Sequence, residues 1–183
     1  MSLTGCGHNV KIVTALERSK SELLTTLCDY AESKTGRAPD GVDLRVVLQA
    51  FYRHVAPEDL VERDVTDLYG AVMAQLRLAT QRPQGTASVR IFTPSVSVNG
   101  WSAGGHTVVE VLTDDMPFLV DSVSMALGEA QRDIHLVIHP QFVVRRDLSG
   151  QLLEVVLAVA EEREVVVSQP AQERGTLLHL LGR

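Results

Sequence analysis

The sequence predicts an α+β protein in which a helical N-terminal segment, residues 1–83, precedes a domain built on an antiparallel sheet, residues 84–183. Before Pro83, apolar residues recur at intervals of three and four, which is the period of an amphipathic helix. After Pro83 they alternate with polar residues, which is the period of a half-buried strand. With 183 residues, of which 45% are hydrophobic, the chain has enough material to bury a core.

The N-terminal segment contains three runs with helical period. The first spans residues 10–32, and Asn9 is placed to cap its start. The turn-forming stretch "SKTGRAPDG" separates it from a second run, "VDLRVVLQAFYRHV". The third run begins at Pro57, which a first helical turn tolerates, and ends at Pro83. We therefore expect three helices before the sheet begins.

The second half begins with two β-rich runs, "ASVRIFTPSVSV" and "HTVVEVLT", separated by the turn "NGWSAGG". The longest strand candidate spans residues 134–146, and "DLSG" is a hairpin turn from it into "QLLEVVLAVA". Its core face would hold Ile134, Leu136, Ile138, Phe142 and Val144. A run with helical period precedes this strand, and its apolar side consists of Leu119, Val123, Ala126, Leu127 and Ala130.

The stretch "TDDMPFLVDSVSMAL" joins a strand to this helix and contains an acidic pair. Asp115, with Asp114 beside it, is placed to accept amide hydrogen bonds at the helix start, where the helix dipole favours negative charge. Pro117 fits the first turn because its missing N–H would be unpaired there. Capping therefore explains the pair better than catalysis does.

Composition narrows the classes of partner and compartment. The formal net charge is −6 and the only dense basic spot is Arg145–Arg146, so we expect no nucleic-acid partner. Two cysteines, Cys6 and Cys28, do not form a disulfide framework, which favours a cytoplasmic protein. No run of apolar residues is long enough to predict a membrane span. Residues 1–3 have the appearance of a leader added before the protein itself.

Four segments resemble one known family: "FYRHVAPEDLVERD", "DLYGAV", "TVVEVLTDDMPFLVDSV" and "IHLVIHPQFVVRRD". They are similar to the N-terminal region of the very large bacterial NAD-dependent glutamate dehydrogenases. The resemblance implies an ACT-like βαββαβ module with an antiparallel sheet and its helices on one face. Such modules are regulatory, associate side by side and in many proteins bind amino acids. The expected last helix and strand are not evident, because "QPAQERGTLLHLLGR" suggests only a short apolar helix, so we expect a truncated C-terminal end.

The resemblance also implies what this chain lacks. The parent reaction converts L-glutamate, NAD and water to 2-oxoglutarate, ammonium and NADH in a domain far downstream. No G-x-G-x-x-G follows a strand here, so we expect no cofactor in this chain and no activity from it alone. Its expected partners are the rest of the parent polypeptide and further copies of itself.

The resemblance points to one effector-binding loop, formed by Asp114, Asp115, Met116, Pro117 and Phe118. In amino-acid-binding relatives this loop reads Asp, any residue, Pro, Gly, and the glycine lets a ligand approach the backbone. Phe118 stands at the glycine position, and its side chain would restrict that approach. A structural turn and an amino-acid effector site are both open interpretations of the loop.

Three histidines form the remaining candidate site. His135 and His139 project from the same face of the predicted strand, and His106 would join them if the strands pair side by side. Strand positions four apart are separated by roughly 13 Å, too far to share one metal ion, so we expect no metal site. We expect His135, His139 and Arg145 to lie at a contact with another domain or subunit, with Pro140 interrupting the ladder.

Three functions follow from these patterns. The first is a regulatory and oligomerisation segment of a glutamate dehydrogenase. The second is an autonomous amino-acid sensor using the loop at residues 114–118. The third is a small independent enzyme using Asp114, Asp115 or His139, which has only the presence of titratable groups behind it.

Overall fold

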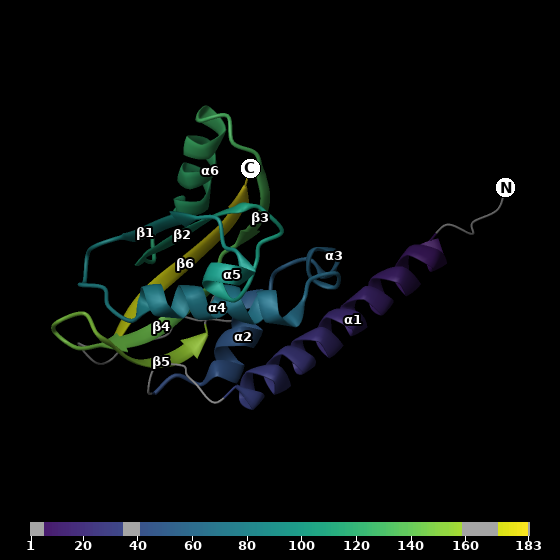
Figure 1. Cartoon of the computed structure of the whole chain (residues 1–183), viewed down its shortest axis with the longest axis horizontal. Helices are drawn as coiled ribbons and strands as arrows, with labels where there is room; N and C mark the ends of the chain where they lie inside the picture. The colour runs from purple at the N-terminus through teal and green to yellow at the C-terminus, as the bar shows by residue number, and fades with distance from the viewer. Residues whose placement is uncertain (1–5, 35–40, 159–171, 183) are drawn as a thin grey trace.

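The computed structural model describes residues 6–34, 41–158 and 172–182. It confirms the α+β class: helices come first, and a six-stranded antiparallel sheet follows. Figure 1 shows α1, α2 and α4 gathered on one side of the sheet, with α6 standing on the other. No helix of the described residues is long and apolar enough to cross a membrane.

The described part of the N-terminal segment contains four helices: α1 (Cys6–Ser33), α2 (Leu44–Tyr52), α3 (Pro57–Leu60) and α4 (Val65–Ala79). The prediction that Asn9 caps the first helix was wrong, because α1 already begins at Cys6. The third predicted run is two helices rather than one. Asp64 accepts a hydrogen bond from the Thr66 amide at 2.7 Å, so a new helix begins at Val65.

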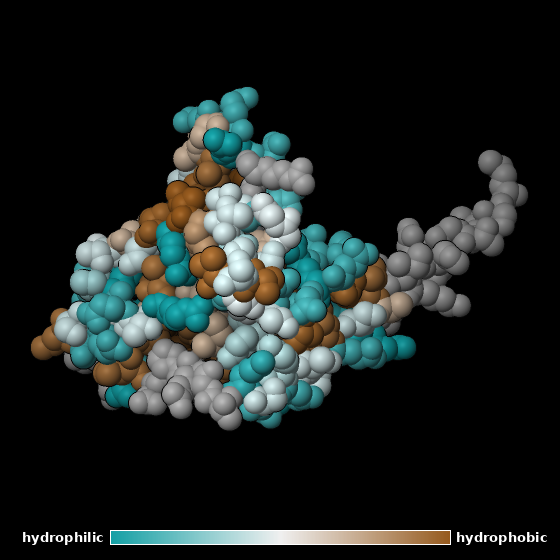
Figure 2. Space-filling view, in the orientation of Figure 1, coloured by the Kyte–Doolittle hydropathy of each residue, from teal (hydrophilic) through white to brown (hydrophobic). Residues whose placement is uncertain are grey.

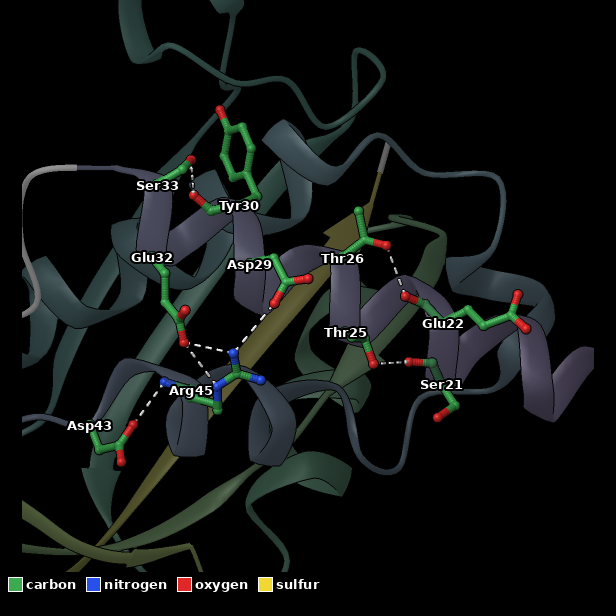
Figure 3. Close-up of polar contacts among 10 residues, drawn as sticks. All are labelled: Ser21, Glu22, Thr25, Thr26, Asp29, Tyr30, Glu32, Ser33, Asp43 and Arg45. Atoms are coloured by element: carbon green, nitrogen blue, oxygen red, sulfur yellow. Dashed lines mark hydrogen bonds and ion pairs between the residues drawn. The ribbon is translucent and has the colours of Figure 1, made fainter.

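Exposed polar contacts join the C-terminal part of α1 to the start of α2 (Figure 3). The Arg45 guanidinium lies 2.6 Å from a Glu32 carboxylate oxygen and 3.4 Å from one of Asp29. Asp43 caps α2 by accepting the amide hydrogens of Arg45 and Val46. These ion pairs face solvent, which screens them, so they add little stability. They orient the two helices, whereas burial holds them to the sheet.

The sheet consists of β1 (Ser88–Phe92), β2 (Thr107–Asp114), β3 (Ile134–Ile138), β4 (Gln141–Arg146), β5 (Leu152–Ala158) and β6 (Gln172–Gly182). Its order is β1-β2-β6-β4-β5, and β3 also pairs with β6. The first predicted run stops at Phe92, because Pro94 cannot donate to a ladder. Its remainder forms a short helix, α5 (Val96–Asn99), that ends at left-handed Gly100.

The strand predicted over residues 134–146 is interrupted at His139 and Pro140. Its two parts lie end to end along β6: β3 pairs with residues 179–182 and β4 with residues 172–176. The predicted core face keeps its register across the break, since Ile138, Phe142 and Val144 are all buried. The break leaves His139 and Pro140 outside both strands.

The C-terminal residues form a central strand, so the short apolar helix expected there was wrong. Along β6, Gly175 lies opposite Asp114 and Gly182 opposite Thr107 of β2. Pairing on both sides satisfies the backbone groups of β6 and outweighs the helix preference of its leucines. Residues 159–171, where the expected last helix would lie, fall outside the described residues.

One hydrophobic cluster joins the N-terminal helices to the sheet. It includes Leu27 of α1, Leu48 of α2, Val72 of α4, and Val108 and Leu112 of β2. Residues on both sides of the predicted boundary at residue 83 therefore share a core. Two domains, residues 1–83 and 84–183, stay a prediction.

The opposite face of the sheet carries α6 (Leu119–Glu129). Val109 and Val111 alternate with the core residues of β2 and contact the apolar side of this helix. Ala126 and Ala130 of the predicted apolar side are exposed, and no residue of α6 is buried. The helix therefore covers its face of the sheet only partly.

Candidate functional site

The loop between β2 and α6 faces the break between β3 and β4 across a hollow of about 420 Å³. Residues 115–121 line one side of the hollow, and His139 and Gln141 line the other. Four of the five residues predicted for an effector site meet here: Asp115, Met116, Pro117 and Phe118. The fifth, Asp114, is not among the lining residues.

Asp114 instead holds a buried arginine. Its carboxylate oxygen accepts a hydrogen bond from Arg82 Nη2 at 2.6 Å, and the Arg82 side chain is fully buried. Arg82 also donates from Nη1 to the Thr86 carbonyl at 2.7 Å and from its amide to the Gly150 carbonyl at 2.9 Å. The pair therefore ties the end of β2 to the connection between α4 and β1 and to the β4–β5 turn.

The prediction that the acidic pair caps α6 was wrong. The residue at the N-cap is Phe118, whose side chain makes no capping hydrogen bond. Pro117 precedes the helix instead of occupying its first turn. The reason lies in tertiary contacts: Asp114 is taken by Arg82, and Asp115 accepts a hydrogen bond from Gln141 Nε2 at 3.1 Å.

Phe118 adopts a left-handed backbone conformation, with φ 62° and ψ 15°. Glycine adopts this conformation without strain, whereas other residues incur a penalty of about 1–2 kcal/mol. The loop thus keeps the backbone shape that a glycine would favour although a phenylalanine occupies the position. Because 75% of the Phe118 surface is exposed, its side chain points largely to solvent and the hollow beside it stays open.

His139 supplies the opposite wall. Its Nε2 is inaccessible to solvent and has no hydrogen-bond partner among the described residues. Burial lowers the pKa of this imidazole below its ordinary value, and the nearby Asp115 carboxylate opposes that shift only in part. The lowered pKa favours the neutral form of the imidazole.

The hollow combines groups of opposite polarity. The carboxylates of Asp115 and Asp121 can attract an ammonium group. The first amides of α6 have no carbonyl partner within the helix and lie at its positive end, where a carboxylate is favoured. A small zwitterion fits this combination. No group of three metal-ligating side chains occurs in the described part of the chain.

The residues predicted for a subunit contact do not converge. The His135 ring lies 4.6 Å from the His106 ring, centroid to centroid, at the far end of β3 from His139. Arg145 forms an exposed ion pair with Glu154 on the neighbouring strand at 2.8 Å. The contact itself stays a prediction, and of these three residues only His139 lines the hollow beside the loop.

Sequence reasoning missed three residues of this region: Arg82, Asp121 and Gln141. Arg82 and Asp114 are 32 positions apart, and only the fold brings them together. Arg146 was noted only as part of a basic spot, yet it is buried and donates from Nη1 to the carbonyls of Ala79 and Gly150. The one local signal was Pro140, since a proline inside a strand predicts a break that redirects its neighbours.

Comparison with known proteins identifies the relatives of this chain. The family model described as "Glutamate dehydrogenase, ACT1 domain" matches residues 47–180. A protein of Pseudomonas aeruginosa named NAD-specific glutamate dehydrogenase is 32% identical over 117 residues, 64% of this chain and 7% of that protein. A protein of the same name from Halomonas elongata is 31% identical over 141 residues, 77% of this chain and 9% of that protein. No solved structure matches.

Proposed function

Because the chain belongs to the ACT1-domain family of glutamate dehydrogenases, we propose that it is a regulatory and oligomerisation segment of an NAD-specific glutamate dehydrogenase. The parent would convert L-glutamate, NAD and water to 2-oxoglutarate, ammonium and NADH in the cytoplasm. The observation that carries this proposal is the extent of the matches. The family match covers most of this chain, while the chain spans only 7% and 9% of the two relatives.

The chemistry of the described residues supports a role other than catalysis. The sequence has no glycine-rich dinucleotide motif after a strand, so NAD would bind elsewhere in the parent. Asp114 is committed to Arg82, which argues against a catalytic pair with Asp115. The alternative of a small independent enzyme using these carboxylates or His139 is therefore less well supported, because Asp114 is paired with Arg82 and not with Asp115.

A test of the regulatory role compares the isolated chain with the parent. We expect no glutamate-dependent NADH production by the purified chain at any pH. The parent lacking these residues should retain glutamate turnover but change its response to amino acids or its assembly state. NADH formation by the isolated chain would contradict the proposal, as would a truncated parent that behaves in every respect like the intact one.

A second candidate function is binding of a free amino acid in the hollow between residues 115–121 and His139. The pairing of carboxylates with helix amides favours it, because an α-amino acid presents an ammonium group beside a carboxylate. Titration calorimetry of the chain with each common amino acid tests this function. We expect Asp121→Asn to weaken any binding, whereas Asp59→Asn, on the remote helix α3, should not. An absence of heat with every amino acid would exclude a sensor that works alone.

A further inference from the structure

The sheet edges at β5 and β1 differ in how they are protected. At β5, Gly41 lies so close to the strand that a Cβ on it would be 2.3 Å from the Leu153 carbonyl oxygen. Gly41 has φ +81° and can pass at this distance because it has no side chain. The chain at Gly41 therefore passes directly beside this edge at Leu153. At β1 the strand has a neighbour on one side only among the described strands, as β3 also does.

The β1 edge also exposes apolar side chains. Val89 is 59% and Ile91 66% exposed, and they lie opposite Val111 and Val109 of β2 on the face that carries α6. Figure 2 shows hydrophobic residues gathered at the base of α6. The strand has no lysine, proline or bulge, which are the usual means by which proteins discourage pairing at an exposed edge.

The sequence of β1, "SVRIF", is self-complementary about its central residue. If a second β1 strand pairs antiparallel around a two-fold axis at Arg90, Val89 of each copy lies opposite Ile91 of the other. Isologous contacts of this kind use the same surface on both subunits. The four branched side chains would then cover one another on the α6 side of the joined sheet.

The charge at the centre of the strand does not oppose this pairing. Arg90 Nε donates to Glu110 Oε2 at 2.6 Å, and Arg90 Nη2 donates to the Ala74 carbonyl at 2.9 Å. Glu110 is fully buried, so Arg90 points toward the α4 side and is neutralised within its own subunit. Two copies of Arg90 on the axis would each keep their own carboxylate.

We propose that β1 is the self-association surface of this chain, and that its partner is β1 of a second copy, paired antiparallel about Arg90. This inference rests on the oligomerisation part of the proposed function and is independent of effector binding in the hollow beside α6. A strand from elsewhere in a longer polypeptide is the competing occupant, and it would leave the isolated chain monomeric.

Sedimentation equilibrium of three proteins tests the surface. The wild-type chain should dimerise, and Ile91→Lys should raise the dissociation constant at least about a hundredfold, because it places a charge among apolar groups at the pairing edge. Leu153→Lys, at the β5 edge beside Gly41, is the matched control and should dimerise as the wild type does; Leu153 is 41% exposed. Fluorescence of Trp101, the only tryptophan, verifies that each variant is folded.

Cysteine cross-linking tests the register. In a Cys6→Ser background, Val89→Cys protein mixed with Ile91→Cys protein should form a disulfide-linked dimer faster than either variant alone. Directly opposite positions have Cβ atoms about 4.5–5.5 Å apart, whereas diagonal ones are about 7–8 Å apart. The native Cys28 is 1% exposed and should not compete.

The outcomes distinguish self-association of the chain, the β1 surface and the register about Arg90. A wild-type chain that stays monomeric at its highest soluble concentration would overturn both the β1 surface and self-association by this chain. A wild-type dimer that Ile91→Lys leaves intact would overturn the surface alone. Equal cross-linking of the mixed and unmixed variants would overturn the register about Arg90.

Discussion

Replacement of Asp114 by asparagine should destabilise the folded chain, although sequence analysis placed this residue in an effector loop. Arg82 is fully buried, and its guanidinium donates to Asp114 at 2.6 Å. Loss of one partner of a buried ion pair costs about 3–5 kcal/mol because the remaining charge is left uncompensated. Asp114 is 38% exposed and asparagine keeps one acceptor oxygen, so we expect a smaller loss, about 2 kcal/mol.

Urea denaturation followed by Trp101 fluorescence measures this loss, since Trp101 is 3% exposed and is the only tryptophan. For a chain of this size about 2 kcal/mol corresponds to a decrease in Tm of about 4–8 °C. Asp115→Asn is the matched control, because Asp115 is exposed and its bond to Gln141 is 3.1 Å long. We expect that control to cost less than about 0.5 kcal/mol.

A double-mutant cycle with Arg82→Met isolates the contribution of the pair itself. The coupling free energy between Asp114→Asn and Arg82→Met should be about 1–3 kcal/mol, as for other residues in direct contact. Additive effects of the two changes would refute the reasoning. So would a free energy of unfolding for Asp114→Asn equal to that of the wild type, because Asp114 would then be available to a ligand instead of holding the loop.

Three further predictions concern the loop, the core and the buried histidine. Phe118→Gly should be about 1 kcal/mol more stable than Phe118→Ala in urea denaturation, because only glycine adopts φ 62° without strain; equal stabilities would contradict this. Gly70→Ala should destabilise the chain by about 1–3 kcal/mol despite its better helix propensity, because the added Cβ would lie 2.3 Å from the Trp101 side chain. The measurement is a decrease in Tm, and an increase would show that the indole moves aside. The pKa of His139 is lowered in the folded state, so the unfolded chain binds more protons below pH 6.5 and stability should fall on acidification. The decrease in the urea midpoint between pH 7 and pH 5 should be smaller in His139→Gln than in the wild type.

The position of the effector loop was predictable from the sequence, but the roles of its residues were not. The strand-to-helix order around residues 113–127 follows from the spacing of apolar residues, which changes there from every second position to every third or fourth. Whether a carboxylate caps a helix depends on its other partners. Arg82 and Gln141 lie far from the acidic pair in sequence, and each donates a hydrogen bond to one of its carboxylates.

The C-terminal strand illustrates a second limit. Its leucine-rich sequence is compatible with a short helix, and local propensity differs by less than 1 kcal/mol per residue between such choices. The decision comes from the unpaired edges of β2 and β4, between which β6 completes the sheet. The sequence of residues 172–182 alone does not predict that two unpaired strands lie on either side of it.

The sequence by itself determined the class of fold, the change from helices to strands near residue 83 and the loop that joins β2 to α6. These features follow from the spacing of apolar residues, which each segment carries within itself. Only the tertiary structure decided that Asp114 pairs with a buried arginine, that His139 faces the loop, and that β1 leaves an apolar edge open while Gly41 passes beside β5. Each of these depends on groups brought together from distant parts of the chain, where burial and hydrogen-bond partners outweigh local preference.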